Sequence, residues 1–345
     1  MRAGLSALAR LAAAGVLMVG AVDVGTLPPA NAAGATSGRA GEGGRRGARG
    51  PVVAVETSDI PRFWRAYDMA AGKSPEDAAR IYQKEYLDRG SPGLKDYASL
   101  RIHGADAMAR DIAAHAQYYA AIRNTTLSLD TSTALHDALD SIAHRFGEVY
   151  DGARIPTVWL VIGRLSSGGS ISGHGVLIGV EMYARDSTTT TSELSVWQLS
   201  ATGFASDLPL VIAHEMVHAQ QAPAKTLRST LLEQALIEGG ADFVGEKISG
   251  GHTNRAQYAY GRAHERDLWR AFQRDMTGTD WSGWLYNAKD ATPVRPADLG
   301  YFIGYRICEA YYGRAHDERP ALRDIVLIPD APRMLRESAY DGAGP

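Results

Sequence analysis

Residues 207–218 read Asp-Leu-Pro-Leu-Val-Ile-Ala-His-Glu-Met-Val-His. An aspartate followed by an early proline is typical of the first turn of a helix, with Asp207 as the expected cap. The side chains before and between the histidines are mostly apolar, so we predict a largely buried helix over 207–221. Two histidines and a glutamate inside such a helix need polar partners or a metal ion.

The two histidines of this segment are four residues apart, which places them on one face of a helix, one turn apart. His214 and His218 can therefore share one zinc ion. Glu215 points about 100° away from His214 around the helix, where it can take a proton from a metal-activated water without being a ligand. The alternative is a charged, solvated helix face, which the apolar neighbours disfavour.

A catalytic zinc needs a third protein ligand and one open position. A third histidine six residues after His218 is ruled out, because that position is Ala224. The next predicted helix, over 227–249, offers a glutamate instead. Glu238 is the expected third ligand, and Glu233 is its rival.

The residues after Glu238 support that choice. Gly239, Gly240 and Ala241 are small and permit close packing between helices. Asp242 lies four residues after Glu238, hence on the same face, and is expected to accept a hydrogen bond from the other ring nitrogen of a zinc-bound histidine, His214 above all.

At these residues the chain resembles the gluzincins, zinc peptidases with a His-Glu-x-x-His helix and a downstream glutamate ligand. More narrowly, it is similar to a family of predicted secreted zinc-dependent proteases, classed as a domain of unknown function and related to gliding-motility lipoproteins. The resemblance rests on 86–94 with Arg101-Ile102, on 214–220, on 238–242 and on 300–307. It implies zinc and a zincin-like fold of the gluzincin type.

The resemblance also draws attention to two late tyrosines, Tyr301 and Tyr305. They share a helix face, and a tyrosine hydroxyl can donate to the oxyanion of a tetrahedral intermediate. Packing between helices explains both side chains equally well. His264 is a further candidate for this role.

The overall pattern predicts an α+β fold: a mainly helical zincin-like domain with a small antiparallel sheet. Two apolar, β-branched runs, 156–163 and 175–183, are expected to pair as a hairpin through a flexible loop at 166–175, in which His174 faces solvent. We expect the strand 175–183 to form the edge along which a peptide pairs. Helices are predicted from residue 59 and over 74–88, 94–123, 131–147, 207–221, 227–249, 254–276, 298–313 and 319–328.

The first 32 residues have the three-part plan of a secretory signal peptide. Arg2 and Arg10 precede a short apolar stretch, and Ala30-Asn31-Ala32 is typical of a cleavage site. A Gly/Arg-rich linker is expected over 33–55, followed by a single domain over 56–345. We therefore expect a secreted, extracytoplasmic protein with no stable membrane insertion after cleavage.

Charge and cysteine content exclude several kinds of site. The net charge of −3 gives no general attraction to nucleic acid. The single cysteine, Cys308, rules out an internal disulfide and every multi-cysteine zinc site. Cys308 itself is expected to be buried and inert.

Together these features predict a secreted zinc metallopeptidase of the gluzincin type that acts on a peptide or protein substrate. His214, His218 and Glu238 hold Zn²⁺, and Glu215 is the general base. The alternative is a secreted, non-catalytic binding or assembly protein that a metal stabilises. A zinc amidase or esterase acting on cell-wall material is a weaker third possibility.

Overall fold

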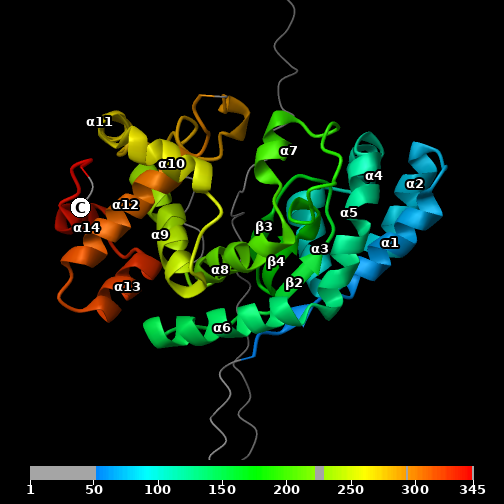
Figure 1. The fold of residues 1–345 in the computed structure, drawn as a ribbon, viewed down its shortest axis with the longest axis horizontal. Coiled ribbons are helices and arrows are strands. Elements are labelled where there is room, and N and C mark those ends of the chain that lie inside the picture. The colour runs from blue at the N-terminus through cyan, green and yellow to red at the C-terminus, as the bar shows by residue number, and fades with distance from the viewer. Residues whose placement is uncertain (1–51, 222–228, 293, 344–345) are drawn as a thin grey trace, which may run out of the picture.

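The computed structural model describes residues 52–221, 229–292 and 294–343 (Figure 1). The signal peptide and most of the linker predicted from the sequence lie outside these residues. Val53 is buried, and its backbone N–H donates to Asp140. The last residues of the predicted linker thus take part in the fold.

Between the short first strand β1 and the second strand β2, the chain is mainly helical. His103 and Gly104 both have positive φ values, 58° and 103°, which no α-helix accommodates. The single helix predicted over 94–123 is therefore divided, and a π-helical segment also ends the predicted helix 74–88. The helices are α1 (Asp59–Ala70), α2 (Pro75–Ile81) with the π-helical Tyr82–Leu87, α3 (Pro92–Tyr97), α4 (Ala105–Ala114), α5 (Ala116–Ser128) and α6 (Thr133–Val149).

Buried tyrosines join these helices to the loop that follows the second strand. Tyr86 donates to the backbone carbonyl of Ile162, Tyr119 to that of Gly163, and Tyr97 to that of Ser167. A buried carbonyl needs such a partner. The helical layer therefore fixes the backbone that leads into the third strand, which borders the site described below.

The sheet has four strands in the order β1-β2-β4-β3 and is mixed, not antiparallel as predicted. β1 pairs with β2 and β2 with β4 in parallel, whereas β3 and β4 are antiparallel. The strands are β1 (Val55–Glu56), β2 (Val158–Val161), β3 (Gly169–Ser172) and β4 (Gly175–Gly179).

Three predictions about this sheet are wrong because the strand β3 was not predicted from the sequence. The segment predicted as a flexible loop at 166–175 contains β3, whose Gly and Ser side chains give a weak strand signal. The hairpin therefore joins β3 to β4 around the exposed His174, and the apolar strands β2 and β4 lie parallel, buried on both faces. As a result β4 is internal, and β3 forms one edge of the sheet, with β1 at the other.

The C-terminal half is again helical. The helix predicted over 254–276 is broken at His264, whose backbone leaves the helical region (φ −124°, ψ 18°). The helices are α7 (Val196–Ala201), α8 (Leu208–His218), α9 (Leu231–Ser249), α10 (Arg255–Ala263), α11 (Glu265–Asp275), α12 (Leu299–Arg314), α13 (Glu318–Leu327) and α14 (Ala331–Ser338). Of these, α7 and α14 were not predicted.

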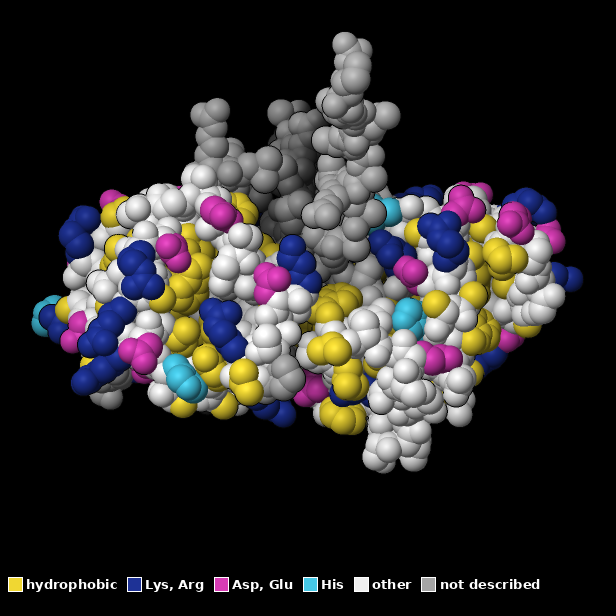
Figure 2. Space-filling model, turned by 90° about the horizontal axis from the view of Figure 1, so that it is seen from above, with side chains coloured by type: hydrophobic (Ala, Val, Ile, Leu, Met, Phe, Trp, Pro, Cys, Tyr) yellow, Lys and Arg dark blue, Asp and Glu magenta, His cyan; other side chains and the backbone are white. Residues whose placement is uncertain are grey.

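The two halves meet at α8. This helix packs on β3 and β4, on α6 and on α9, and α9 in turn packs against α12 and α13 (Figure 1). The prediction of a mainly helical α+β fold is confirmed. Acidic and basic side chains are interspersed over the face in Figure 2, and within the described ranges no helix is long and apolar enough to cross a membrane.

Candidate metal centre

Three side chains from α8 and α9 converge on one point. His214 and His218 approach each other to 2.9 Å between their Nε2 atoms. Oε2 of Glu238 lies 3.6 Å from Nε2 of His214 and 3.3 Å from Nε2 of His218. One ligand atom from each residue thus lies within 4.8 Å of the others, the arrangement that a single small cation requires.

Close helix packing brings these residues together. The two histidines share a face of α8, as their spacing requires, and that face lies against α9. Gly245 of α9 lies so near α8 that a Cβ atom there would be 3.4 Å from the Cα of His214. Glu238 is 1% exposed, so its carboxylate has left water and depends on the partners that surround it.

Asp242 holds His214 from the side opposite the cluster. Its Oδ1 lies 2.8 Å from Nδ1 of His214, while its Oδ2 accepts hydrogen bonds from Asn254 and Tyr258. Burial opposes the charge of Asp242, but these bonds, that of His214 first, lower the pKa of its carboxyl. The carboxylate therefore stays charged and directs Nε2 of His214 toward Glu238.

Two further supporting residues were not predicted. Gln221 lies with its Oε1 2.6 Å from Nδ1 of His218, and Tyr286 donates to Oε1 of Glu238 at 2.6 Å. Gln221 follows three residues after its partner, a spacing that could have indicated it. Tyr286 has a positive φ of 56° in an irregular segment before α12, and the sequence around it carries no comparable signal.

The cluster fits a zinc ion. Oε2 of Glu238 is buried without a hydrogen-bond partner among the described residues, which is costly unless something else compensates its charge. Two imidazoles and one carboxylate are a typical ligand set of a catalytic zinc, which keeps one position open. The Nδ1 atoms of both histidines have partners outside the cluster, so the two Nε2 atoms face each other and Glu238 and can act as ligands.

Glu215 lies beside the cluster and against the edge strand. It is 3% exposed, and a Cβ atom on Gly169 of β3 would be 2.3 Å from its Oε1. Burial raises the pKa of Glu215, while His218, His214 and Arg101 oppose that shift. Arg101 is held by Ser170 of the same strand through Nε and Nη2, at 3.1 and 2.9 Å.

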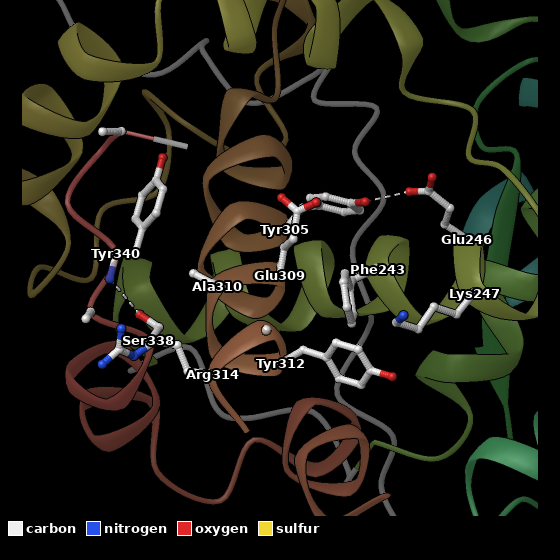
Figure 3. A pocket seen from close by; sticks show the side chains of 13 residues that line it. Phe243, Glu246, Lys247, Tyr305, Glu309, Ala310, Tyr312, Arg314, Ser338 and Tyr340 are labelled. Carbon is white, nitrogen blue, oxygen red and sulfur yellow. Dashed lines mark hydrogen bonds between the residues drawn. The ribbon is translucent and has the colours of Figure 1, made fainter. Parts of the chain in front are cut away.

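The remaining candidates are spread over the fold. The ring of Tyr301 stacks near His214, with centroids 6.2 Å apart. Tyr305 instead donates to Glu246 and lines a separate pocket between α9, α12 and the C-terminal segment (Figure 3). Glu233 accepts from Thr230 in the cap of α9, and His264 is exposed at the start of α11.

Two further predictions from the sequence concern Cys308 and Asp207, which lie outside the cluster. Cys308 is fully buried, and burial raises the pKa of its thiol well above the usual range, so it is inert as expected. Asp207 precedes α8, but its side chain makes no capping bond to that helix. It accepts from the backbone N–H of Phe204 instead.

A family model described as "Predicted Zn-dependent protease (DUF2268)" matches residues 186–322. The matched stretch contains all of α8 and α9, and with them the complete His-His-Glu cluster and Asp242. No curated protein and no solved structure matches the chain. Over this part, the chain is therefore similar to a family of predicted zinc-dependent proteases.

Proposed function

We propose that this protein is a secreted zinc metallopeptidase of the gluzincin type, with His214, His218 and Glu238 as the metal ligands. The single observation that carries the proposal is the buried carboxylate oxygen of Glu238, which has no hydrogen-bond partner within the described part of the chain and faces two imidazole nitrogens. The similarity to predicted zinc-dependent proteases supports the same reading.

When bound there, zinc would act as a Lewis acid that polarises a water molecule and the substrate carbonyl. Glu215 takes a proton from the attacking water and passes it to the leaving amine. Its buried position raises its pKa, which makes the protonated form accessible and suits a group that must both accept and release a proton. Arg101 supplies a positive charge that favours the carboxylate before it accepts the proton.

Two tyrosines complete the proposed site. Tyr286 holds the carboxylate of Glu238 through one oxygen and leaves the other free for the metal. Tyr301 stacks near His214 and is the better placed of the two predicted oxyanion donors. Tyr305 takes no part, because its hydroxyl is bound to Glu246.

The edge strand β3 takes the role that the sequence assigned to 175–183. An extended peptide that pairs with β3 passes beside Gly169, where Glu215 reaches the strand. Backbone pairing of this kind gives affinity without side-chain preference, so specificity must come from other surfaces. Export to an extracytoplasmic compartment belongs to the same proposal and rests on the signal-peptide pattern of residues 1–32.

The test replaces Glu215 by glutamine, which keeps the shape of the side chain and removes its basicity. We expect Glu215→Gln to bind zinc as the wild type does and to lose at least about a hundredfold in the cleavage of casein or a quenched peptide library. Glu246→Gln is the control, because this glutamate accepts a hydrogen bond from Tyr305, which takes no part in the proposed site, and its replacement should leave activity unchanged. A Glu215→Gln variant with full activity would sink the mechanism.

The non-catalytic alternative makes a different forecast. A protein that uses zinc only for structure is stabilised by the metal, and neither the wild type nor Glu215→Gln hydrolyses any peptide. The same two proteins therefore distinguish the two functions.

A further inference from the structure

A cleft of about 540 Å³ opens beside the metal centre and shares its walls. Tyr286 and Tyr301 line it, and so does Gly168, the residue before the glycine that meets Glu215. A substrate whose peptide bond lies at the cluster therefore extends into this cleft. The other side of the cleft is formed by 196–207, which includes α7, the short helix labelled near the upper edge of Figure 1.

One arginine that lines this cleft, Arg185, has no carboxylate partner among the described residues. Nε of Arg185 is buried and has no hydrogen-bond partner, and no acidic side chain of the described residues forms an ion pair with its guanidinium. The other arginine of the cleft, Arg255, differs, because its Nη2 lies 3.7 Å from Asp207. A partly buried guanidinium without an anion is costly, and an incoming carboxylate is its natural partner.

The position of Arg185 is fixed before any ligand arrives. Its backbone N–H donates to Gly203, and residue 185 forms a β-bridge with Phe204. Its guanidinium carbon lies 5.4 Å from the centre of the Phe204 ring, a cation–π distance. Little conformational entropy is then lost when the guanidinium binds an anion.

Exposed apolar side chains line the mouth of the same cleft. Val196 is 77% exposed and Phe204 45% exposed, and both line the cleft together with Trp197. Large apolar side chains held this far in water are typical of a binding surface. A ligand with only an acidic group would leave these apolar side chains without a partner. A carboxylate next to an aliphatic or aromatic side chain contacts both Arg185 and the apolar side chains.

We propose that this cleft is a substrate subsite in which Arg185 binds a carboxylate while the apolar mouth binds a neighbouring hydrophobic side chain. The preferred substrates are therefore peptides with a carboxylate beside an apolar residue. The carboxylate is either the chain terminus or an aspartate. This inference rests on the proposed peptidase function for its biological meaning, but the subsite itself can be tested by binding alone.

The experiment measures peptide binding to zinc-loaded Glu215→Gln protein, which should not cleave the probes. The probes are fluorescein-labelled hexapeptides in two pairs: Leu at the free C-terminus against the same peptide as an amide, and internal Asp-Leu against Asn-Leu. We expect the carboxylate member of at least one pair to bind about tenfold more tightly. The pair that shows the difference identifies whether the cleft binds a C-terminal carboxylate or an aspartate side chain.

Two variants in the same background complete the test. Arg185→Gln should reduce the carboxylate preference to near one, while Arg255→Gln, the matched cleft arginine that already has a partner, should keep it. A preference that survives in Arg185→Gln overturns the proposal, and so does its loss in Arg255→Gln alone. If Arg185→Gln does not fold, the parent still decides, because equal binding of all four probes overturns the subsite.

The two proposals can fail separately. A carboxylate preference in binding without any cleavage by zinc-loaded wild type refutes the peptidase and leaves the subsite in place. Cleavage by the wild type without a carboxylate preference in binding supports the peptidase and refutes the subsite.

Discussion

At the scale of single residues, the His-His-Glu cluster depends on side chains that are not among the three proposed ligands. Asp242 is the clearest case, since it binds Nδ1 of His214 and is itself held by Asn254 and Tyr258. Its charge makes the imidazole a stronger ligand and fixes the ring.

We predict that Asp242→Asn weakens zinc binding about tenfold or more, because the amide orients His214 without the charge. Competition with a chromophoric chelator measures the affinity. Asp267→Asn is the control, since Asp267 is an exposed residue of α11. Unchanged affinity in Asp242→Asn would show that His214 needs no anionic partner.

Helical periodicity is a local rule, and it is what led from the sequence to the residues that the fold brings together. The spacing from His214 to His218 and from Glu238 to Asp242 fixes which side chains share a face. Tyr286 could not be predicted, because it reaches Glu238 from an irregular segment through a positive φ. The spacing places Tyr301 and Tyr305 on one helix face. Only the fold shows that Tyr301 lies near His214, whereas the hydroxyl of Tyr305 donates to Glu246.

At the scale of elements, the edge strand and the helix α8 constrain one another. Gly169 of β3 leaves the space that the carboxylate of Glu215 occupies, and a Cβ atom there would approach Oε1 to 2.3 Å.

We predict that Gly169→Ala displaces Glu215 and lowers peptide cleavage by about a hundredfold, because the base loses its position. Zinc content should stay unchanged, since the nearest atoms that a Cβ on Gly169 would meet all belong to Glu215, which is not a ligand. Gly173→Ala, in the turn of the same hairpin, meets nothing within 4 Å and should retain activity. If both variants cleave equally well, β3 does not position the base.

The pairing of α9 with α12 sets how closely the third ligand can approach. A Cβ atom on Gly239 would lie 2.1 Å from the backbone nitrogen of Tyr305, so the two helix backbones are nearly in contact. Gly239 directly follows Glu238 in the chain.

We predict that Gly239→Ala destabilises the protein by about 3 kcal/mol, because the clash is with backbone that cannot rotate away. Gly313→Ala, in the last turns of α12, meets nothing within 4 Å and should be neutral or stabilise by up to about 1 kcal/mol. Urea unfolding of both variants measures the difference. Equal stabilities would mean that the helices separate at little cost.

The same scale shows where sequence reasoning failed. Adjacent apolar runs indicated a hairpin, yet β2 and β4 are parallel neighbours, because the Gly/Ser-rich β3 inserts between them in the chain and pairs with β4. Strand pairing is a property of distant backbone, and the weak propensity of β3 hid it. The helix boundaries were predicted more closely, apart from the breaks at His103 and His264. The glycine that follows His103 could have indicated the first break, because glycine is common at helix ends.

At the scale of the whole molecule, the metal centre lies where the two halves join. Its histidines come from α8, which packs on the sheet, and its glutamate comes from α9, which packs on α12 and α13. An ion at this point would join α8, which packs on the sheet, to α9, which packs on α12 and α13, and would compensate the buried charge of Glu238.

We therefore predict that zinc stabilises the entire fold and not only the site. A ligand that binds the native state alone adds about 4 kcal/mol at a thousand times its dissociation constant, so chelation should lower the melting temperature by several degrees. His218→Ala, which removes one ligand, should melt at the same temperature with and without zinc. Identical melting of wild-type protein with excess zinc and with excess chelator would contradict a metal at this junction. If zinc still raises the melting temperature of His218→Ala, the stabilising zinc ion binds at a different site.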